Sequence, residues 1–213
     1  MRFMKNAMLV VAVVLLTSCA TVKYNTLEKV GIHKRDLLVG NVKDTRNAQK
    51  DAQEEFQDAL ERFGNIVTIE NTNLKKAYDR LDKEYESSKD AAEEVSEQIE
   101  ETEEVAKDLF AEWRKENKTY NDEVLRRDSE SKLADTEARY KEMLKSMKQA
   151  EASMKPILAS LHDNVLYLKH NLNAQAVGSL KSTYSNLEGD IGVLIQRLNQ
   201  SIARSDEFIK QMK

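Results

Sequence analysis

The sequence offers few side chains for thiol or metal chemistry: 213 residues include one Cys, Cys19, and three His. With so few ligands we expect neither a structural zinc site nor a disulfide. His162 and His170 are eight residues apart, which on a helix separates them by about 12 Å along the axis, too far to share a metal. We expect both at the surface or at a helix end. No nucleophile elbow, phosphate loop or dinucleotide fingerprint occurs, so we predict no catalytic residue, metal or cofactor.

Cys19 is the one side chain whose position indicates chemistry. Arg2 and Lys5 precede an apolar run of ten residues, from Ala7 to Leu16. That run is too short to cross a bilayer, which takes about 20 residues, but it fits the hydrophobic region of a secretion signal.

The residues before the thiol, Leu16, Thr17 and Ser18, resemble the lipobox of bacterial lipoproteins. In that motif the Cys accepts a diacylglyceryl group and becomes the first residue of the mature chain. We therefore predict a lipoprotein signal peptide over residues 1–18 and a lipidated Cys19. The alternative is an ordinary signal peptide followed by a free Cys.

A lipidated Cys19 implies a membrane partner. Two or three acyl chains give a stable anchor at about 0.8 kcal/mol per buried methylene. In lipoproteins of the enterobacterial type, an Asp after the Cys signals retention in the inner membrane. The residue here is Ala20, so we predict a lipid anchor in the bacterial outer membrane that faces the periplasm.

The elements that must position any site are helical. Charged residues make up 33% of the chain and aromatic residues 6%, with six Gly and one Pro, a composition that favours long helices. Without residues 1–18 the chain has 31 basic and 37 acidic residues. Such a mixed, mildly acidic surface argues against nucleic acid as a partner.

Periodicity predicts an all-α fold, an elongated antiparallel coiled-coil helical bundle of three long helices plus a shorter N-terminal one. We assign residues 19–40 to the lipidated Cys and a tether, with at most a short helix near Leu27 or Leu37, and residues 41–213 to the bundle. The expected helices cover about 41–63, 68–118, 123–170 and 174–212. Gly64 and Asn65 are expected to end the first helix, and Pro156 should kink the third without breaking it.

The second helix carries a heptad stripe over twelve positions, from Leu74 to Trp113. The fourth helix has a wider apolar face, so we expect it to contact two neighbours. The first should lie beside the start of the second. Gly189 and Gly192 in the fourth helix indicate either close approach of another helix or tolerated drift.

Charges favour an antiparallel hairpin of the second and third helices. With a turn centred near residues 120 and 121, opposing residue numbers should sum to about 241. The expected ion pairs are Glu93 with Lys148, Glu97 with Lys145, and Glu100 with Lys141. Alternatively, the acidic stretch is a solvated face that binds nothing.

Two groups of residues are candidates for binding a partner. Phe110, Trp113 and Tyr120 should cluster at one end of the rod, as the core of the hairpin tip or as a docking tip. His170, Asn171 and Asn173 should surround a helix junction, where capping explains most of the polarity and a binding site is the alternative. The Met stripe of the third helix should fill the core rather than form a binding groove.

The segment YNTLEKVGIHKRDLLVGNVKDTRNAQKDAQEEFQDALERFG, together with LRRDSE and LKHNLNAQAVGSL, resembles the bacterial family known as domain of unknown function 2959. The resemblance covers nearly all of the chain after Cys19. It implies an envelope lipoprotein with no assigned activity and brings no catalytic or ligand residues.

Our leading hypothesis is a non-enzymatic, membrane-anchored coiled-coil scaffold or adaptor that binds envelope proteins. A peptidoglycan tether through Lys213 and an accessory subunit of an envelope complex are alternatives, and an enzyme acting alone is the least favoured. The oligomeric state is left open, with a homo-oligomer among the alternatives.

Overall fold

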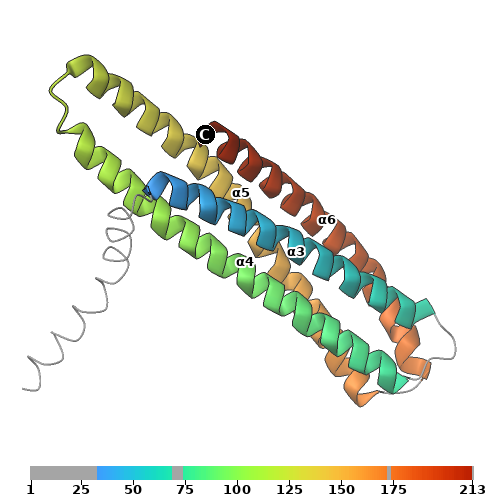
Figure 1. Ribbon diagram of the computed structural model, residues 1–213. Helices are drawn as coiled ribbons and strands as arrows, with labels where there is room; N and C mark the ends of the chain where they lie inside the picture. Colours follow the sequence, from blue (N-terminus) through green and yellow to red (C-terminus); the bar gives the residue numbers. More distant parts are fainter. Residues whose placement is uncertain (1–32, 69–73, 172–173, 213) are drawn as a thin grey trace, which may run out of the picture.

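The computed structural model describes residues 33–68, 74–171 and 174–212. They form four helices: α3 (Lys34–Thr68), α4 (Leu74–Asn117), α5 (Glu123–His170) and α6 (Ala174–Met212) (Figure 1). Within these ranges no residue belongs to a strand. The predicted all-α helical bundle is confirmed.

The helices run alternately up and down and pack as the four corners of a bundle. α3 and α5 each pack against both α4 and α6, so α6 contacts two neighbours, as its wide apolar face predicted. α4 has 44 residues and α5 has 48, which correspond to about 66 and 72 Å at 1.5 Å per residue. These long helices give the molecule the elongated shape seen in Figure 1.

The heptad stripes form the core. On α4, the buried positions Leu81, Ser88, Val95, Ile99 and Thr102 are all members of the predicted stripe. On α5, the Met stripe is inside the bundle, because Met143, Met147 and Met154 are at most 2% exposed. Core filling is therefore the correct interpretation of these methionines. No described helix is both long and apolar enough to cross a bilayer.

The first helix differs from the prediction at both ends. α3 begins at Lys34, before the expected start at residue 41, because Leu38 and Val42 are fully buried and extend the apolar seam. Residues 34–40 of the expected tether are therefore helical. α3 also continues through Gly64 to Thr68, whereas we expected Gly64 to end it. The next helix correspondingly starts at Leu74 and not near residue 68.

The register between α4 and α5 also differs from the prediction. Lys148 pairs with Glu103 at 2.7 Å, not with Glu93, and Ser96 donates a hydrogen bond to Glu151 at 2.7 Å. The residue numbers of the observed partners sum to 251 and 247, whereas the prediction was about 241. The reason is the connection at residues 118–122, which Figure 1 shows rising along the helix axis, so that α5 starts beyond the end of α4.

Of the two alternatives for the glycines of α6, the structure favours tolerated drift over close helix approach. A Cβ built on Gly189 or Gly192 would have no described neighbour within 4 Å, so close approach of another helix is the wrong interpretation. At Gly64, in contrast, a Cβ would lie 3.0 Å from the Tyr184 hydroxyl oxygen and 3.1 Å from its ring. The space beside Gly64 is thus filled by Tyr184, whose ring also packs edge-on against Phe63 at 5.8 Å.

These surroundings predict that replacing glycine by alanine changes stability differently at these three positions. Gly189→Ala and Gly192→Ala should each raise the free energy of unfolding by about 0.5–1 kcal/mol, because Ala is the better helix former and meets no obstacle. Gly64→Ala should gain nothing or lose stability, since Tyr184 would have to move. Urea unfolding followed by circular dichroism at 222 nm measures all three. A similar gain at Gly64 would contradict the packing described here.

Candidate functional site

The α4/α5 hairpin projects beyond the other two helices at one end of the bundle (Figure 1). Lys34, the first residue of α3, forms an ion pair with Glu112 at 3.0 Å. Arg35 donates a hydrogen bond to the carbonyl of Met212, the last residue of α6. Four-helix packing therefore stops near Glu112 on α4. We call residues 113–137 the hairpin extension.

The inner face of the hairpin extension is held by a buried polar chain. The Trp113 indole N–H donates to the Ser129 hydroxyl at 2.8 Å, and that hydroxyl donates to the Asn117 side-chain oxygen at 2.6 Å. Ser129 and Asn117 are both buried. One turn lower, the ring of Phe110 packs against Tyr140 with centroids 5.4 Å apart. Phe110 and Trp113 are thus part of the hairpin's interior, which supports the structural interpretation of both.

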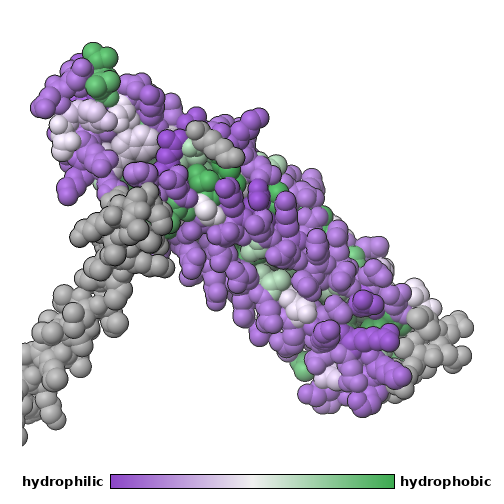
Figure 2. Space-filling view, viewed as in Figure 1, coloured by the Kyte–Doolittle hydropathy of each residue, from purple (hydrophilic) through white to green (hydrophobic). Residues whose placement is uncertain are grey.

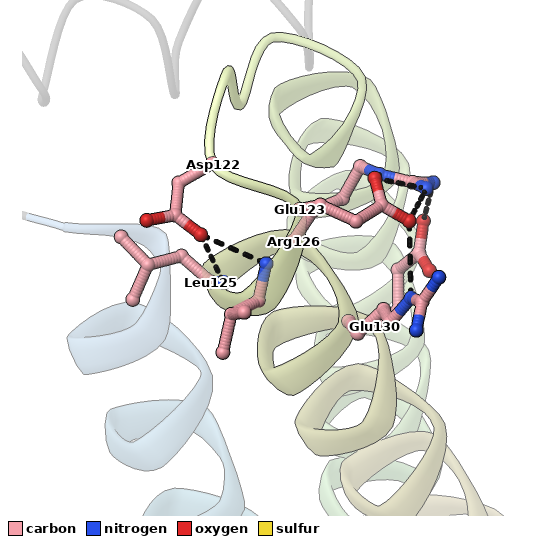
Figure 3. A network of polar contacts seen from close by, with 7 residues as sticks. Asp122, Glu123, Leu125, Arg126 and Glu130 are labelled. Atoms are coloured by element: carbon pink, nitrogen blue, oxygen red, sulfur yellow. Dashed lines mark hydrogen bonds and ion pairs between the residues drawn. The ribbon is translucent and has the colours of Figure 1, made fainter.

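The first turn of α5 is fixed by a cap and by ion pairs, which Figure 3 shows on opposite sides of the helix. The Asp122 carboxylate accepts hydrogen bonds from the backbone N–H groups of Val124 and Leu125 at 2.8 and 3.1 Å, which satisfies two donors of the helix start. Arg126 pairs with Glu123 at 2.6 Å and with Glu130 at 3.0 Å. The hydrogen bonds from Arg126 lower the pKa of Glu123.

Three apolar side chains are exposed at the end of the hairpin extension. Tyr120 is 44% exposed, Val124 77% and Leu125 55%. We call these three residues the tip cluster. Figure 2 shows hydrophobic residues at this outermost end of the molecule, next to a mostly hydrophilic surface.

Of the residues predicted for this end, only Tyr120 is strongly exposed, whereas Trp113 is half-buried and Phe110 is buried. Val124 and Leu125 were not among the residues predicted for this end, because the buried face of α5 begins beyond them, at Ser129 and Leu133. One signal was nevertheless present: Asp122 is a typical N-cap, which places Val124 and Leu125 in the first turn of the helix.

The other candidate group lies at the opposite end of the bundle. His170 is exposed at the end of α5, and Asn171 is the C-cap, with its backbone N–H donating to the carbonyls of Tyr167 and Leu168. The Asn171 side chain also donates to the Tyr167 carbonyl at 3.0 Å. Capping therefore accounts for Asn171. Asn173 lies outside the described residues.

The described residues bring together no group of three His, Cys, Asp or Glu side chains that could hold a metal ion. His162 is at the surface, as expected, with its ring 5.4 Å from that of Tyr85. Cys19 and the lipobox residues Leu16, Thr17 and Ser18 lie outside the described part of the chain.

Tyr140 is a buried phenol in the core of the bundle. It is 7% exposed and packs against Phe110 and Phe208. Burial, and secondarily the charge of Glu103, raise its pKa above the ordinary value of 10.0. Because the folded protein holds this proton more tightly than the unfolded chain, the associated stability is present below pH 10 and is lost as the pH rises further.

Tyr140→Phe removes that titration, so its stability should fall less between pH 8 and pH 11 than that of the unsubstituted protein. Urea unfolding at the two pH values measures the difference, and Tyr120→Phe is the control that removes an exposed phenol. Equal losses in all three proteins would show that the Tyr140 phenol ionises as freely in the folded state as in the unfolded one.

Comparison with known proteins places the chain in a family. Residues 23–212, nearly the whole chain, match the family described as "Protein of unknown function (DUF2959)". No curated protein matches the sequence. The match extends over all four described helices and both ends of the bundle. The chain therefore belongs to the DUF2959 family of proteins of unknown function.

Proposed function

We propose that this protein is a non-enzymatic envelope lipoprotein, held by a lipid on Cys19 in the bacterial outer membrane, that acts as a helical scaffold or adaptor facing the periplasm. The observation that carries the proposal is the sequence Leu16-Thr17-Ser18-Cys19 shortly before a long helical rod. Only 14 residues separate Cys19 from Lys34, so the rod would be held close to the bilayer.

The shape of the rod supports a scaffold role. A bundle with helices of about 70 Å presents a long surface to partners at a defined distance from its anchor. That surface is mixed in charge, and its ion pairs include exposed ones within single helices, such as Lys132 with Asp128. Such pairs add little stability but keep the surface polar, which suits a protein whose partners bind reversibly.

The geometry gives less support to the peptidoglycan tether. Met212 is 8% exposed and lies beside Arg35 at the start of α3. A covalent link at Lys213 would therefore attach peptidoglycan near the anchor end of the rod. The rod would then add no distance between the membrane and the cell wall, which is what a spacer of this length would provide.

Metabolic labelling with an alkyne fatty acid tests the anchor. We expect the label on the protein, the protein in the outer-membrane fraction, and both lost in Cys19→Ser. Ser18→Ala, which keeps a small residue before the thiol, is the matched control and should retain both. An unlabelled protein, or a Cys19→Ser variant that stays in the membrane fraction, would refute the lipid anchor.

The scaffold role needs a separate test, because an anchored protein need not have partners. Cross-linking in intact cells, followed by affinity recovery and mass spectrometry, should identify the same envelope proteins with the lipidated chain in repeated experiments. Recovery of the lipidated chain without any reproducible partner would refute the adaptor role but not the lipid anchor.

A further inference from the structure

The tip cluster places half of the strongly exposed large apolar side chains of the described structure at one end of the molecule. The others are distributed along the rod: Leu166 and Tyr167 lie on α5 near its C-terminal end, and Val193 lies on α6. One or two exposed apolar residues at one place are normal on a protein surface. Three within six consecutive positions, at the extreme end of a hairpin, need an explanation.

The fold holds the tip cluster outward. The inner face of the hairpin extension is occupied by Trp113, Ser129 and Leu133, and α3 and α6 end before they could cover the tip. The Asp122 cap and the ion pairs of Arg126 hold the first turn of α5 in helical form. Val124 and Leu125 are thus presented to the surroundings by an ordered helix start.

The first residues that the structure describes, His33 and Lys34, lie at this same end of the bundle. Lys34 lies against Glu112, five residues before the end of α4, whereas α5 extends about 20 Å further, to Glu123. The 14 residues from Ala20 to His33 can span at most about 45–50 Å. A lipid on Cys19 can therefore lie in the bilayer surface that the tip touches.

The size and charge of the tip also favour a lipid surface over a protein. A stable protein interface needs roughly 20–30 residues on each side, and the tip cluster has three. Between Lys118 and Glu130 there are three cationic and four anionic side chains, and Arg126 and Arg127 are both paired with Glu123. Apolar insertion, not attraction to anionic headgroups, must then provide the contact.

We propose that the tip cluster inserts into the interfacial region of the bilayer that carries the N-terminal lipid, which gives the rod a second, weak point of membrane contact. The proposal rests on the lipid anchor proposed above. Aliphatic side chains and an amphipathic Tyr ring are the residues that such an interface accepts. Two contacts on one surface strengthen each other through the high local concentration that the tether imposes, and together they restrict the tilt of the rod.

Cys19 is the only thiol in the chain, which allows the test to be made without cellular lipidation. The purified chain from Cys19 to Lys213 is coupled through this thiol to a maleimide lipid in phosphatidylcholine vesicles. A photoreactive diazirine amino acid replaces Leu125 in one sample and Val193, a comparably exposed apolar residue of α6, in the other. After irradiation, mass spectrometry distinguishes lipid adducts from protein adducts.

We expect lipid adducts at position 125 and few at position 193. With the photoreactive residue at Tyr120, Val124→Ser combined with Leu125→Ser should lower the adduct yield by about tenfold, since the two aliphatic groups supply most of the insertion. The yield should not change when anionic lipid or salt is added. Circular dichroism checks that the variant keeps its helices.

Equal lipid adducts at positions 125 and 193, or none at 125, would overturn the tip contact even if Cys19 is lipidated in cells. The same photoreactive residues in living cells provide the second arm. Protein adducts at position 125 without lipid adducts would assign the tip cluster to a protein partner and overturn the proposal. If the chain is not lipidated in cells, the proposed anchor is refuted. The vesicle experiment still tests the tip contact, because its lipid is coupled chemically.

Discussion

Leu161→Ala should lower the free energy of unfolding by about 2–5 kcal/mol. Leu161 is fully buried in the bundle core, and Ala would leave a cavity that the surrounding packed side chains close only in part. A domain of this size has a total stability of about 5–15 kcal/mol, so the variant should lose a large part of it. Urea unfolding followed by circular dichroism measures the loss.

The matched control is the same substitution on the same helix. Leu125 is 55% exposed, so Leu125→Ala should change stability by no more than about 0.5 kcal/mol. If both variants lost equal amounts, the tip cluster would be part of a folded core, and the arrangement of the hairpin extension would be wrong.

Gln49→Met should raise the free energy of unfolding by about 1–3 kcal/mol. Gln49 is fully buried between α3 and its neighbours, and neither its amide nitrogen nor its amide oxygen has a hydrogen-bond partner in the described structure. Burying an unpaired amide is costly. Met has nearly the same length and removes both polar atoms without leaving a cavity.

The neighbouring buried polar residues behave differently. One turn earlier, the Thr45 hydroxyl bonds to the Asn41 carbonyl and lies 2.9 Å from the Thr102 hydroxyl.

Gln57→Met, at an exposed position of α3, is the control for Gln49→Met and should stay within about 0.5 kcal/mol of the unsubstituted protein. A Gln49→Met variant that loses stability would mean that the amide makes favourable bonds and helps to select the packing of this layer.

The amphipathic pattern was sufficient to predict the number and type of the described helices and the limits of α5 and α6. The stripe from Leu74 to Trp113 places apolar residues every three to four positions, and only a buried helical seam satisfies it. Where a glycine interrupts a helix, local rules failed. Gly64 is a typical helix end, yet Tyr184 from a distant helix fills the space beside it, and that contact could not be read from the local sequence.

The register of α4 against α5 could not be predicted because every charge on the two helices has several eligible partners. Lys148 has Glu93, Glu97, Glu100 and Glu103 within reach of plausible registers, and each exposed pair contributes only a few tenths of a kcal/mol. The path of five loop residues decided among them. Because of the same loop, Tyr120, Val124 and Leu125 lie beyond the four-helix part of the bundle. The sequence therefore predicted a tip with Tyr120 but not the exposure of Val124 and Leu125.

The elongated four-helix rod is the claim on which the anchor geometry and the tip contact both depend. Small-angle X-ray scattering of the Cys19→Ser chain without residues 1–18 tests it directly. A rod about 75 Å long and two helices wide predicts a radius of gyration of about 23 Å or more. A compact globule with the same number of residues would give about 16 Å. A value near the smaller figure would contradict the structure, and with it the arrangement proposed for this protein on its membrane.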